Sequence, residues 1–179
     1  MPGGDDIQYF LLFCIDKHKI LYYFFQEYQG ATGLRAILQR VKQASVEVDS
    51  KVVGNIDKGL VLLLGAKSGD QEQDVDYLVD KCLNLRIFED ENGKMNLSAL
   101  DVKAEILVIS QFTLYADTKK GRRPSFTDAL NPEEAERLYQ RFIELTKEKG
   151  LKAESGIFGA KMLVKILNWG PVTLILDSR

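Results

Sequence analysis

Residues 59–67 read Gly-Leu-Val-Leu-Leu-Leu-Gly-Ala-Lys, and the architecture of the domain can be predicted from this apolar run. Five apolar residues follow one another without a polar break, which is typical of a strand that is covered on both faces. The group Asp57-Lys58-Gly59 precedes the run and predicts a turn. We therefore expect a central strand here, with further strands on either side of it.

The segments around this strand are also regular. Before it, Val46, Val48 and Val52 alternate with polar residues, which is the two-residue period of half-buried strands, and Gly54 predicts a turn. After it, apolar residues recur at intervals of three and four, which predicts an amphipathic helix. The elements expected beyond the central strand are a helix over residues 74–88, an apolar strand over 106–115, a helix over 132–149, and closing strands over 152–157, 162–168 and 172–177.

The second helix has clear ends. Asn131 is a good N-cap, Pro132 suits the first helical position, and Gly150 is a natural stop. The break between the last two closing strands is expected at the Gly170-Pro171 pair. Together these elements predict one α/β domain over residues 35–179, rich in β-structure, with two main helices and no internal repeats.

The composition narrows the classes of function. The chain has 179 residues, 45% of them apolar, which is enough for one globular core without metal or disulfide staples. Its two cysteines, Cys14 and Cys82, do not form a metal-binding or disulfide pattern, so we expect a cytoplasmic protein and interpret Cys82 as a core residue. A net charge of −2 and a pI near 5.6 argue against a general nucleic-acid binder, so any RNA contact must be local.

The first 34 residues differ from the rest. Eight of the 17 aromatic residues lie between Tyr9 and Tyr28, together with the only histidine, His18. The apolar stretches of this segment are too short to span a bilayer of about 30 Å, and the start of the chain does not have the basic residues of a signal peptide. We expect no membrane association, and we interpret residues 1–34 as an appended segment or a mis-assigned start.

The sequence does not contain the residues of the common catalytic motifs. With His18 alone and outside the predicted domain, neither a serine nor a cysteine triad can be assembled, nor a histidine-based zinc site. There is no glycine-rich nucleotide-binding motif. We therefore expect no cofactor and no metal, and a hydrolase here would depend on backbone amides, hydroxyls or groups of the substrate.

Three features remain, and each has a simpler interpretation. The hexapeptide Ser110-Gln111-Phe112-Thr113-Leu114-Tyr115 gathers hydroxyls at the end of a strand, but such residues are common in ordinary sheets. A basic cluster follows it and suits phosphate, although a solvated loop is the default. Gly170-Pro171 most often marks a trans turn, since about 5–6% of X-Pro bonds are cis. The basic cluster consists of Lys119, Lys120, Arg122 and Arg123.

Taken together and in order, these motifs resemble the D-aminoacyl-tRNA deacylase family. The resemblance extends from Arg35 to about Ser178 and leaves out the N-terminal segment. It implies a strongly curved, barrel-like sheet and a homodimer. The motifs that carry it are residues 35–41 (RAILQRV), 83–88 (LNLRIF), 110–115 (SQFTLY), 120–126 (KGRRPSF) and 170–173 (GPVT).

The family resemblance also implies how chirality is selected. Gly170 and Pro171 of one subunit would enter the active site of the other with a cis bond between them, their carbonyl oxygens facing the amino group of the substrate. An L side chain would collide with the pair, whereas D-amino acids and glycine, including glycine mischarged on tRNA(Ala), would be accepted. Arg40 would brace the Gly-Pro pair of the partner; without the resemblance, we would interpret it as a surface arginine. Trp169 stands where the family often has an acidic residue, which would alter the rim of the interface.

The hexapeptide would supply the catalytic wall, with Ser110, Gln111, Phe112 and Thr113 as site residues. Backbone N–H groups around Gln111 and Phe112 would bind the oxyanion. Because the chain offers no base to activate Thr113, we favour assistance by the 2′-OH of the terminal ribose. The basic cluster would bind the acceptor end of aminoacyl-tRNA, and we expect no DNA partner. The alternative is a tRNA-binding or synthetase-editing module of the same fold without catalytic activity of its own.

Overall fold

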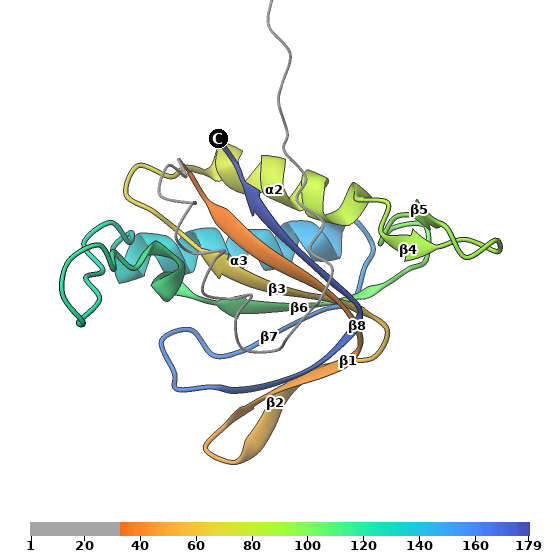
Figure 1. Ribbon diagram of the computed structural model, residues 1–179, viewed down its shortest axis with the longest axis horizontal. Coiled ribbons are helices and arrows are strands. Elements are labelled where there is room, and N and C mark those ends of the chain that lie inside the picture. The colour runs from red at the N-terminus through yellow and green to blue at the C-terminus, as the bar shows by residue number, and fades with distance from the viewer. Residues whose placement is uncertain (1–32) are drawn as a thin grey trace, which may run out of the picture.

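The computed structural model describes residues 33–179, which form a curved sheet with two long helices across one face (Figure 1). The main sheet has the order β2-β1-β3-β6-β7, and β8 pairs with β1 as well. Its strands are β1 (Arg35–Val48), β2 (Lys51–Ile56), β3 (Gly59–Gly65), β6 (Glu105–Ser110), β7 (Ala153–Ser155) and β8 (Leu163–Asp177).

Strand β3 is central, as predicted. It lies antiparallel to β1 and parallel to β6, and its side chains are buried on both faces. Leu60 and Leu62 enter the larger core, beneath the helices, whereas Val61 enters a smaller core on the other face of the sheet. The unbroken apolar run therefore has a packing partner at every position.

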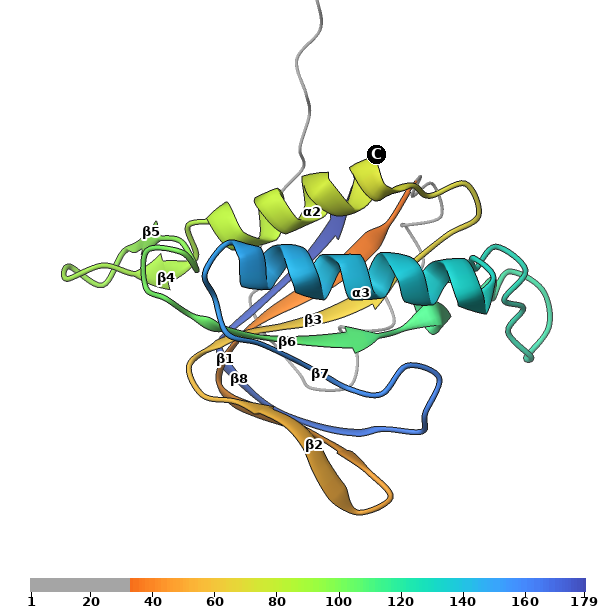
Figure 2. The same ribbon diagram turned by 180° about the vertical axis from the view of Figure 1, so that it is seen from behind.

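The two helices α2 (Glu72–Asn84) and α3 (Pro132–Glu148) lie side by side over the sheet (Figure 2). Asn131 caps α3 as predicted, because its side chain accepts a hydrogen bond from the Glu134 N–H at 3.1 Å. The first helix is shorter than predicted, since the chain leaves helical geometry at Leu85 and continues into a small hairpin of β4 (Phe88–Glu89) and β5 (Met95–Leu97). Cys82 is a core residue, as expected.

Gly54 does not form the predicted turn. It lies inside β2, and the turn before β2 is at Asp49 and Ser50 instead. A Cβ atom on Gly54 would be 2.7 Å from the carbonyl oxygen of Ser155 in β7. The glycine therefore allows β2 to approach β7, and this approach brings the barrel-like sheet close to closure.

Two other strand predictions were wrong. Residues 162–168 and 172–177 belong to one continuous strand, β8, and Gly170-Pro171 lies inside it. The pairing with β1 is irregular there: Gln39 faces Thr173 and Val41 faces Asn168. A bulge of this kind accommodates proline, which has no N–H to donate. The closing strand predicted over residues 152–157 is shortened to β7.

The strand predicted over residues 106–115 ends early. Strand β6 stops at Ser110, and Phe112–Tyr115 forms a short 3-10 helix, η1. Residues 112–115 therefore do not alternate between the two faces of a strand, as the predicted strand over 106–115 required. The chain turns here because the Gln111 N–H donates to the Leu64 carbonyl at 2.8 Å, and because Gly65 has no side chain to block the Gln111 carbonyl, from which a Cβ would be 2.9 Å away.

Candidate active site

A cavity of about 640 Å³ opens where the parallel strands β3 and β6 end. Ligands commonly bind at the carboxyl ends of parallel strands, where the following loops diverge. The start of α3 and the 158–160 turn complete the wall. Among residues 33–179, no charged side chain lines this cavity, which is formed by Leu34, Leu64, Ala66, Ile109, Ser110, Gln111, Phe112, Phe126, Ala129, Leu130, Asn131, Pro132, Ala135, Tyr139, Phe158, Gly159, Ala160, Met162 and Val164.

The backbone hydrogen bonds of the hexapeptide show which of its N–H groups are available to bind an oxyanion. The Gln111 N–H is already bonded to Leu64, so it is not available to bind an oxyanion. The first hydrogen bond of η1 runs from the Leu114 N–H to the Gln111 carbonyl at 3.2 Å. The N–H groups of Phe112 and Thr113 precede this bond, and a helix provides no internal acceptor for its first N–H groups.

The side chains of the hexapeptide have different surroundings. Ser110 is half-buried and lines the cavity with Gln111 and Phe112, whereas Thr113 is not among the lining residues. The Gln111 amide nitrogen donates a hydrogen bond to the Thr113 hydroxyl. An amide group cannot accept a proton at neutral pH, so this contact does not turn Thr113 into a nucleophile.

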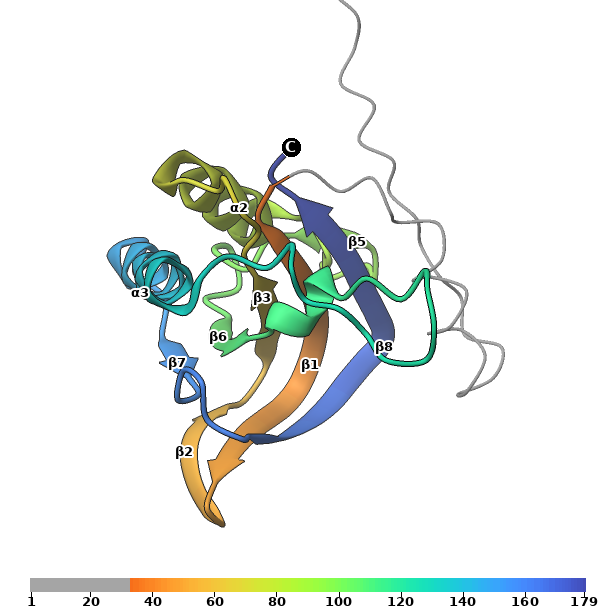
Figure 3. The ribbon, with the colours of Figure 1, turned by 90° about the vertical axis from the view of Figure 1, so that its left-hand side faces the viewer.

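The predicted basic cluster lies beside this cavity. The Phe112 and Phe126 rings meet edge to face with their centroids 5.1 Å apart, which joins the loop to η1. Asp117 and Ser125 pair through two backbone hydrogen bonds of 2.7 and 2.9 Å at the base of the loop. Figure 3 shows the loop projecting away from the short helix η1 and from the strands of the sheet. All four cations, Lys119, Lys120, Arg122 and Arg123, are exposed.

Gly170 and Pro171 lie away from the cavity of their own chain. The bond between them is cis, both residues are exposed, and neither lines the cavity. The structure therefore brings together the hexapeptide and the basic loop, but not the hexapeptide and the Gly-Pro pair, within one subunit.

Arg40 is not a surface residue, because only 1% of it is exposed. Its Nε donates to the Trp169 carbonyl at 3.0 Å and its Nη1 to the Ile87 carbonyl at 2.5 Å, and Glu89 lies 3.7 Å from its Nη2. Burial lowers the pKa of the Arg40 guanidinium, and the charge of Glu89 opposes that change. Within the described chain, Arg40 thus holds the segment before its own Gly170.

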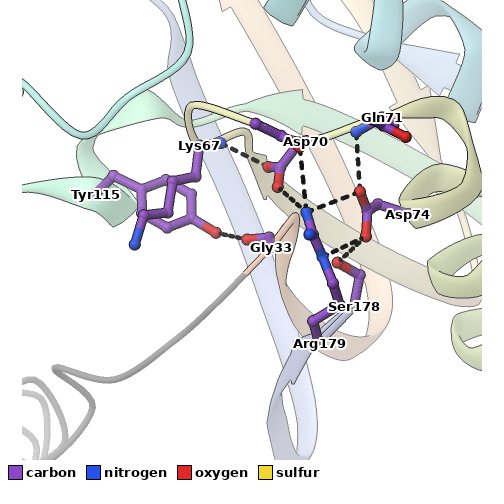
Figure 4. Close-up of polar contacts among 9 residues, drawn as sticks. Gly33, Lys67, Asp70, Gln71, Asp74, Tyr115, Ser178 and Arg179 are labelled. Atoms are coloured by element: carbon purple, nitrogen blue, oxygen red, sulfur yellow. Dashed lines mark hydrogen bonds and ion pairs between the residues drawn. The ribbon is translucent and has the colours of Figure 1, made fainter.

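A polar network lies behind η1 (Figure 4). The Tyr115 hydroxyl donates to the Gly33 carbonyl, and burial raises the pKa of Tyr115. Close by, the Arg179 guanidinium bridges Asp70 and Asp74 with contacts of 3.2 and 3.0 Å. Asp70 also accepts the Lys67 N–H at 2.6 Å, and Lys67 in turn pairs with Ala129 in the cavity wall. This network could not be predicted from the sequence, because Gly33, Tyr115 and Arg179 lie far along the chain from one another and from Asp70 and Asp74.

Two other properties bear on function. Among residues 33–179, no group of three or more His, Cys, Asp or Glu side chains is arranged to hold a metal ion. No helix within the same range is long and apolar enough to cross a membrane. Cys14 and His18 lie outside the described residues.

Comparisons with known proteins agree with one another. Residues 37–177 match the family model described as D-Tyr-tRNA(Tyr) deacylase. The chain is 62% identical over 146 residues to the D-aminoacyl-tRNA deacylase of Aquifex aeolicus (strain VF5), a match that covers 82% of this chain and 99% of the relative.

Solved structures show the same fold. One, named c-Myc DNA Unwinding Element Binding Protein, is 42% identical, has a TM-score of 0.76, and is matched over 81% of this chain and 99% of its own length. A second, described as a probable eukaryotic D-amino acid tRNA deacylase, has a TM-score of 0.71 with 19% identity, over 80% of this chain and 98% of its own. At that identity the second likeness supports the fold alone.

Proposed function

Because this chain belongs to the D-Tyr-tRNA(Tyr) deacylase family, it hydrolyses the ester bond of D-aminoacyl-tRNA, and we propose that the cavity at the ends of β3 and β6 is the site of this reaction. One observation carries the assignment: Ser110, Gln111 and Phe112 line an uncharged cavity of about 640 Å³. The products are the free D-amino acid and tRNA.

The N–H groups of Phe112 and Thr113 are the proposed oxyanion donors. They precede the first hydrogen bond of η1, whereas the Gln111 N–H is occupied by Leu64. Donors fixed in this way before the reaction stabilise the charge that develops on the ester carbonyl oxygen, and removing one such donor in other enzymes costs about 3–4 kcal/mol. The attacking water is activated with help from the 2′-OH of the substrate, and Thr113 shapes the wall through its bond to Gln111.

Chiral selection is proposed to involve a second subunit. Gly170 and Pro171 are exposed and lie outside the lining of their own cavity, so they are free to enter that of a partner. Strand β8 also exposes apolar side chains: Leu163 is 57% and Leu167 55% exposed. Apolar residues on a strand of this kind favour association, and a homodimer that buries them would bring the pair into the partner's site.

The tRNA acceptor end is proposed to lie between the cavity and the loop that carries Lys119, Lys120, Arg122 and Arg123. The described residues that line the cavity carry no charge, so the loop supplies the contacts to phosphate. Although one structural relative is named for binding DNA, the net charge of −2 favours a local contact to RNA over a general affinity for nucleic acids. We place the enzyme in the cytoplasm, where its substrate is made.

The direct test compares D-tyrosyl-tRNA and L-tyrosyl-tRNA as substrates of the purified protein. We expect rapid release of D-tyrosine and little release of L-tyrosine. Equal rates on both substrates, or no release from either, would refute the proposal.

The mechanism has its own test. A D-tyrosyl-tRNA that ends in 2′-deoxyadenosine and is charged on the 3′-OH should react slowly, while Thr113→Ala should keep most of the activity on the normal substrate. Normal turnover of the deoxy substrate, together with an inactive Thr113→Ala, would return Thr113 to the role of nucleophile.

A further inference from the structure

The indole ring of Trp169 is surrounded by three cations. The guanidinium carbon of Arg40 lies 4.5 Å from the ring centroid, and the ammonium nitrogens of Lys42 and Lys58 lie 5.5 and 5.7 Å from it. Tryptophan is the best aromatic partner for a cation within about 6 Å. The ring therefore gathers side chains from β1 and from the turn before β3. We call these four residues the Trp169 patch.

The positive charge of this patch is only partly neutralised. Arg40 has one carboxylate nearby, Glu89 at 3.7 Å. Lys42 and Lys58 are exposed, and within residues 33–179 neither forms an ion pair. The two exposed lysines therefore make a local positive surface on a protein with a net charge of −2, and the buried charge of Arg40 beneath the ring is offset by a single carboxylate. Such a surface favours an anionic partner.

The patch cannot serve the cavity of its own chain. Lys58 immediately precedes β3, while the cavity opens beyond the other end of that strand. A strand of seven residues spans roughly 20 Å at about 3.3 Å per residue. Trp169, however, immediately precedes Gly170. If the Gly-Pro pair enters the cavity of a partner subunit, as the proposed function requires, the patch arrives at the rim of that cavity.

At that rim, the substrate supplies the negative charge. In the part of the chain that the structure describes, no Asp or Glu lines the cavity, so this wall offers no carboxylate to pair with the arriving lysines. The tRNA brings a phosphate with each nucleotide of its 3′ end. We propose that the Trp169 patch binds a backbone phosphate at the 3′ end of the tRNA whose amino acid lies in the partner subunit's cavity. This inference rests on the proposed function.

Each site then draws its cations from two subunits. The loop with Lys119 and Arg122 belongs to the subunit that provides the cavity, and the Trp169 patch belongs to the subunit that provides the Gly-Pro pair. Trp169 keeps Lys42 and Lys58 beside that pair. The same part of β8 therefore provides both the residues that select the D-amino acid and a contact to phosphate.

Binding of uncharged tRNA tests the patch apart from catalysis. The Lys42→Gln/Lys58→Gln variant should bind tRNA more weakly, and the slope of log Kd against log salt should fall by about two, roughly one for each lysine. Lys51→Gln is the matched control, because Lys51 is an exposed lysine at the start of β2, where it pairs with Val48 at the far end of β1. An unchanged slope in the double variant would overturn the proposal. So would weaker dimerisation in sedimentation equilibrium with unchanged tRNA affinity, because the patch would then be a contact between subunits.

Mixed dimers test the arrangement across subunits. A subunit with Lys119, Lys120, Arg122 and Arg123 changed to alanine is co-expressed with a Lys42→Gln/Lys58→Gln subunit, and dimers carrying both affinity tags are purified. One of the two sites then combines an intact loop with an intact patch, so about half of the parent activity on D-tyrosyl-tRNA should return although each variant alone is impaired. No recovery would overturn the proposal. An unsubstituted protein that releases no D-tyrosine would instead refute the proposed function.

Discussion

At the scale of single residues, Gly170 occupies a position that no other residue fits. Its φ of +134° lies in a region that L-residues rarely adopt. A Cβ atom there would be 2.8 Å from Val172 Cγ2 and 3.0 Å from Arg40 Nη2. Because Arg40 is buried and bonded to the Trp169 and Ile87 carbonyls, it has little room to move aside.

Gly170→Ala should therefore displace the Gly-Pro pair and lower kcat/KM on D-tyrosyl-tRNA by about a hundredfold, the size of effect that follows a misplacement of about 1 Å near a reacting group. Gly93→Ala is the control: its φ is +72°, and nothing lies within 4 Å of the added Cβ. Gly93→Ala carries the backbone cost of a left-handed conformation, about 1–2 kcal/mol, without any collision of the added Cβ. If both keep full activity, the placement of Gly170 is irrelevant to the reaction.

Only part of the candidate site could be predicted from the residue types in the sequence. The N-cap at Asn131 and the core position of Cys82 could be predicted because local hydrogen bonding and helical periodicity determine them. The burial of Arg40 could not, because its partners Ile87 and Trp169 lie 47 and 129 positions away in the chain. The occupied N–H of Gln111 was missed for the same reason, since its acceptor Leu64 is on another strand.

At the scale of elements, the basic loop is fixed at its base and free at its tip. The Asp117-Ser125 pair and the contact between Phe112 and Phe126 hold the base beside the cavity. The tip carries Gly121 at a φ of +72° between exposed cations. The loop can therefore bind tRNA without any change in the sheet.

Changing Lys119, Lys120, Arg122 and Arg123 together to alanine should weaken tRNA binding and lower the salt dependence of Kd by about four units of slope, one for each cation. The melting temperature should hardly change, because all four side chains are exposed. Lys147→Ala/Lys149→Ala, at the far end of α3, is the control for loss of surface charge. An unchanged affinity of the loop variant at low salt would remove the loop from the binding surface.

The ends of the helices and strands were harder to predict than their central residues. The central strand β3 follows directly from its apolar run. Strand β6 ends at Ser110 because Gln111 bonds to β3, a long-range contact that the period of the sequence does not reveal. Likewise, Gly54 and Gly170 lie inside strands, at points where other groups of the protein approach the backbone closely. From the sequence, we interpreted both glycines as breaks between elements.

At the scale of the whole molecule, Arg179 joins β8 to α2 and to the turn before α2 through Asp74 and Asp70. Burial raises the pKa of Asp70, while its contacts with Lys67 and Arg179 oppose that change. A carboxyl whose pKa is higher in the folded protein than in the unfolded chain retains protons more strongly when folded. Its contribution to the free energy of unfolding therefore falls as pH rises from about 4 through the folded pKa.

Arg179→Met should raise the pKa of Asp70 further and leave a buried carboxylate without its cation, at a cost of about 1–3 kcal/mol at neutral pH. Because protonated Asp70 tolerates burial, the loss of stability should be small at pH 4.5 and large at pH 7.5, as measured by thermal unfolding at both pH values. Arg141→Met, which removes a surface pair with Glu148, should show no such pH dependence. Equal losses at both pH values would mean that Asp70 is not the group responsible.

The domain is proposed to be complete without the N-terminal segment. Leu34 is fully buried in the larger core, so we propose that the domain includes this residue, just before the boundary expected from the sequence at residue 35. The 146 matched residues also cover 99% of the Aquifex aeolicus relative. Among residues 33–179, no buried side-chain nitrogen or oxygen is without a hydrogen-bond partner. Removing the preceding residues should therefore leave the core and its polar groups intact.

The position of the cut decides the outcome of a truncation. Deleting residues 2–32 joins the initiating methionine to Gly33 and keeps the carbonyl that accepts the Tyr115 hydroxyl, so melting temperature and D-tyrosyl-tRNA hydrolysis should match those of the full chain. Deleting residues 2–33 puts methionine at that position, where a Cβ would be 2.2 Å from Ser178 Oγ. This second variant should melt at a lower temperature, because the methionine displaces Ser178 or withdraws its carbonyl from Tyr115. If the first truncation already fails to fold or loses its activity, residues 2–32 are an integral part of the enzyme.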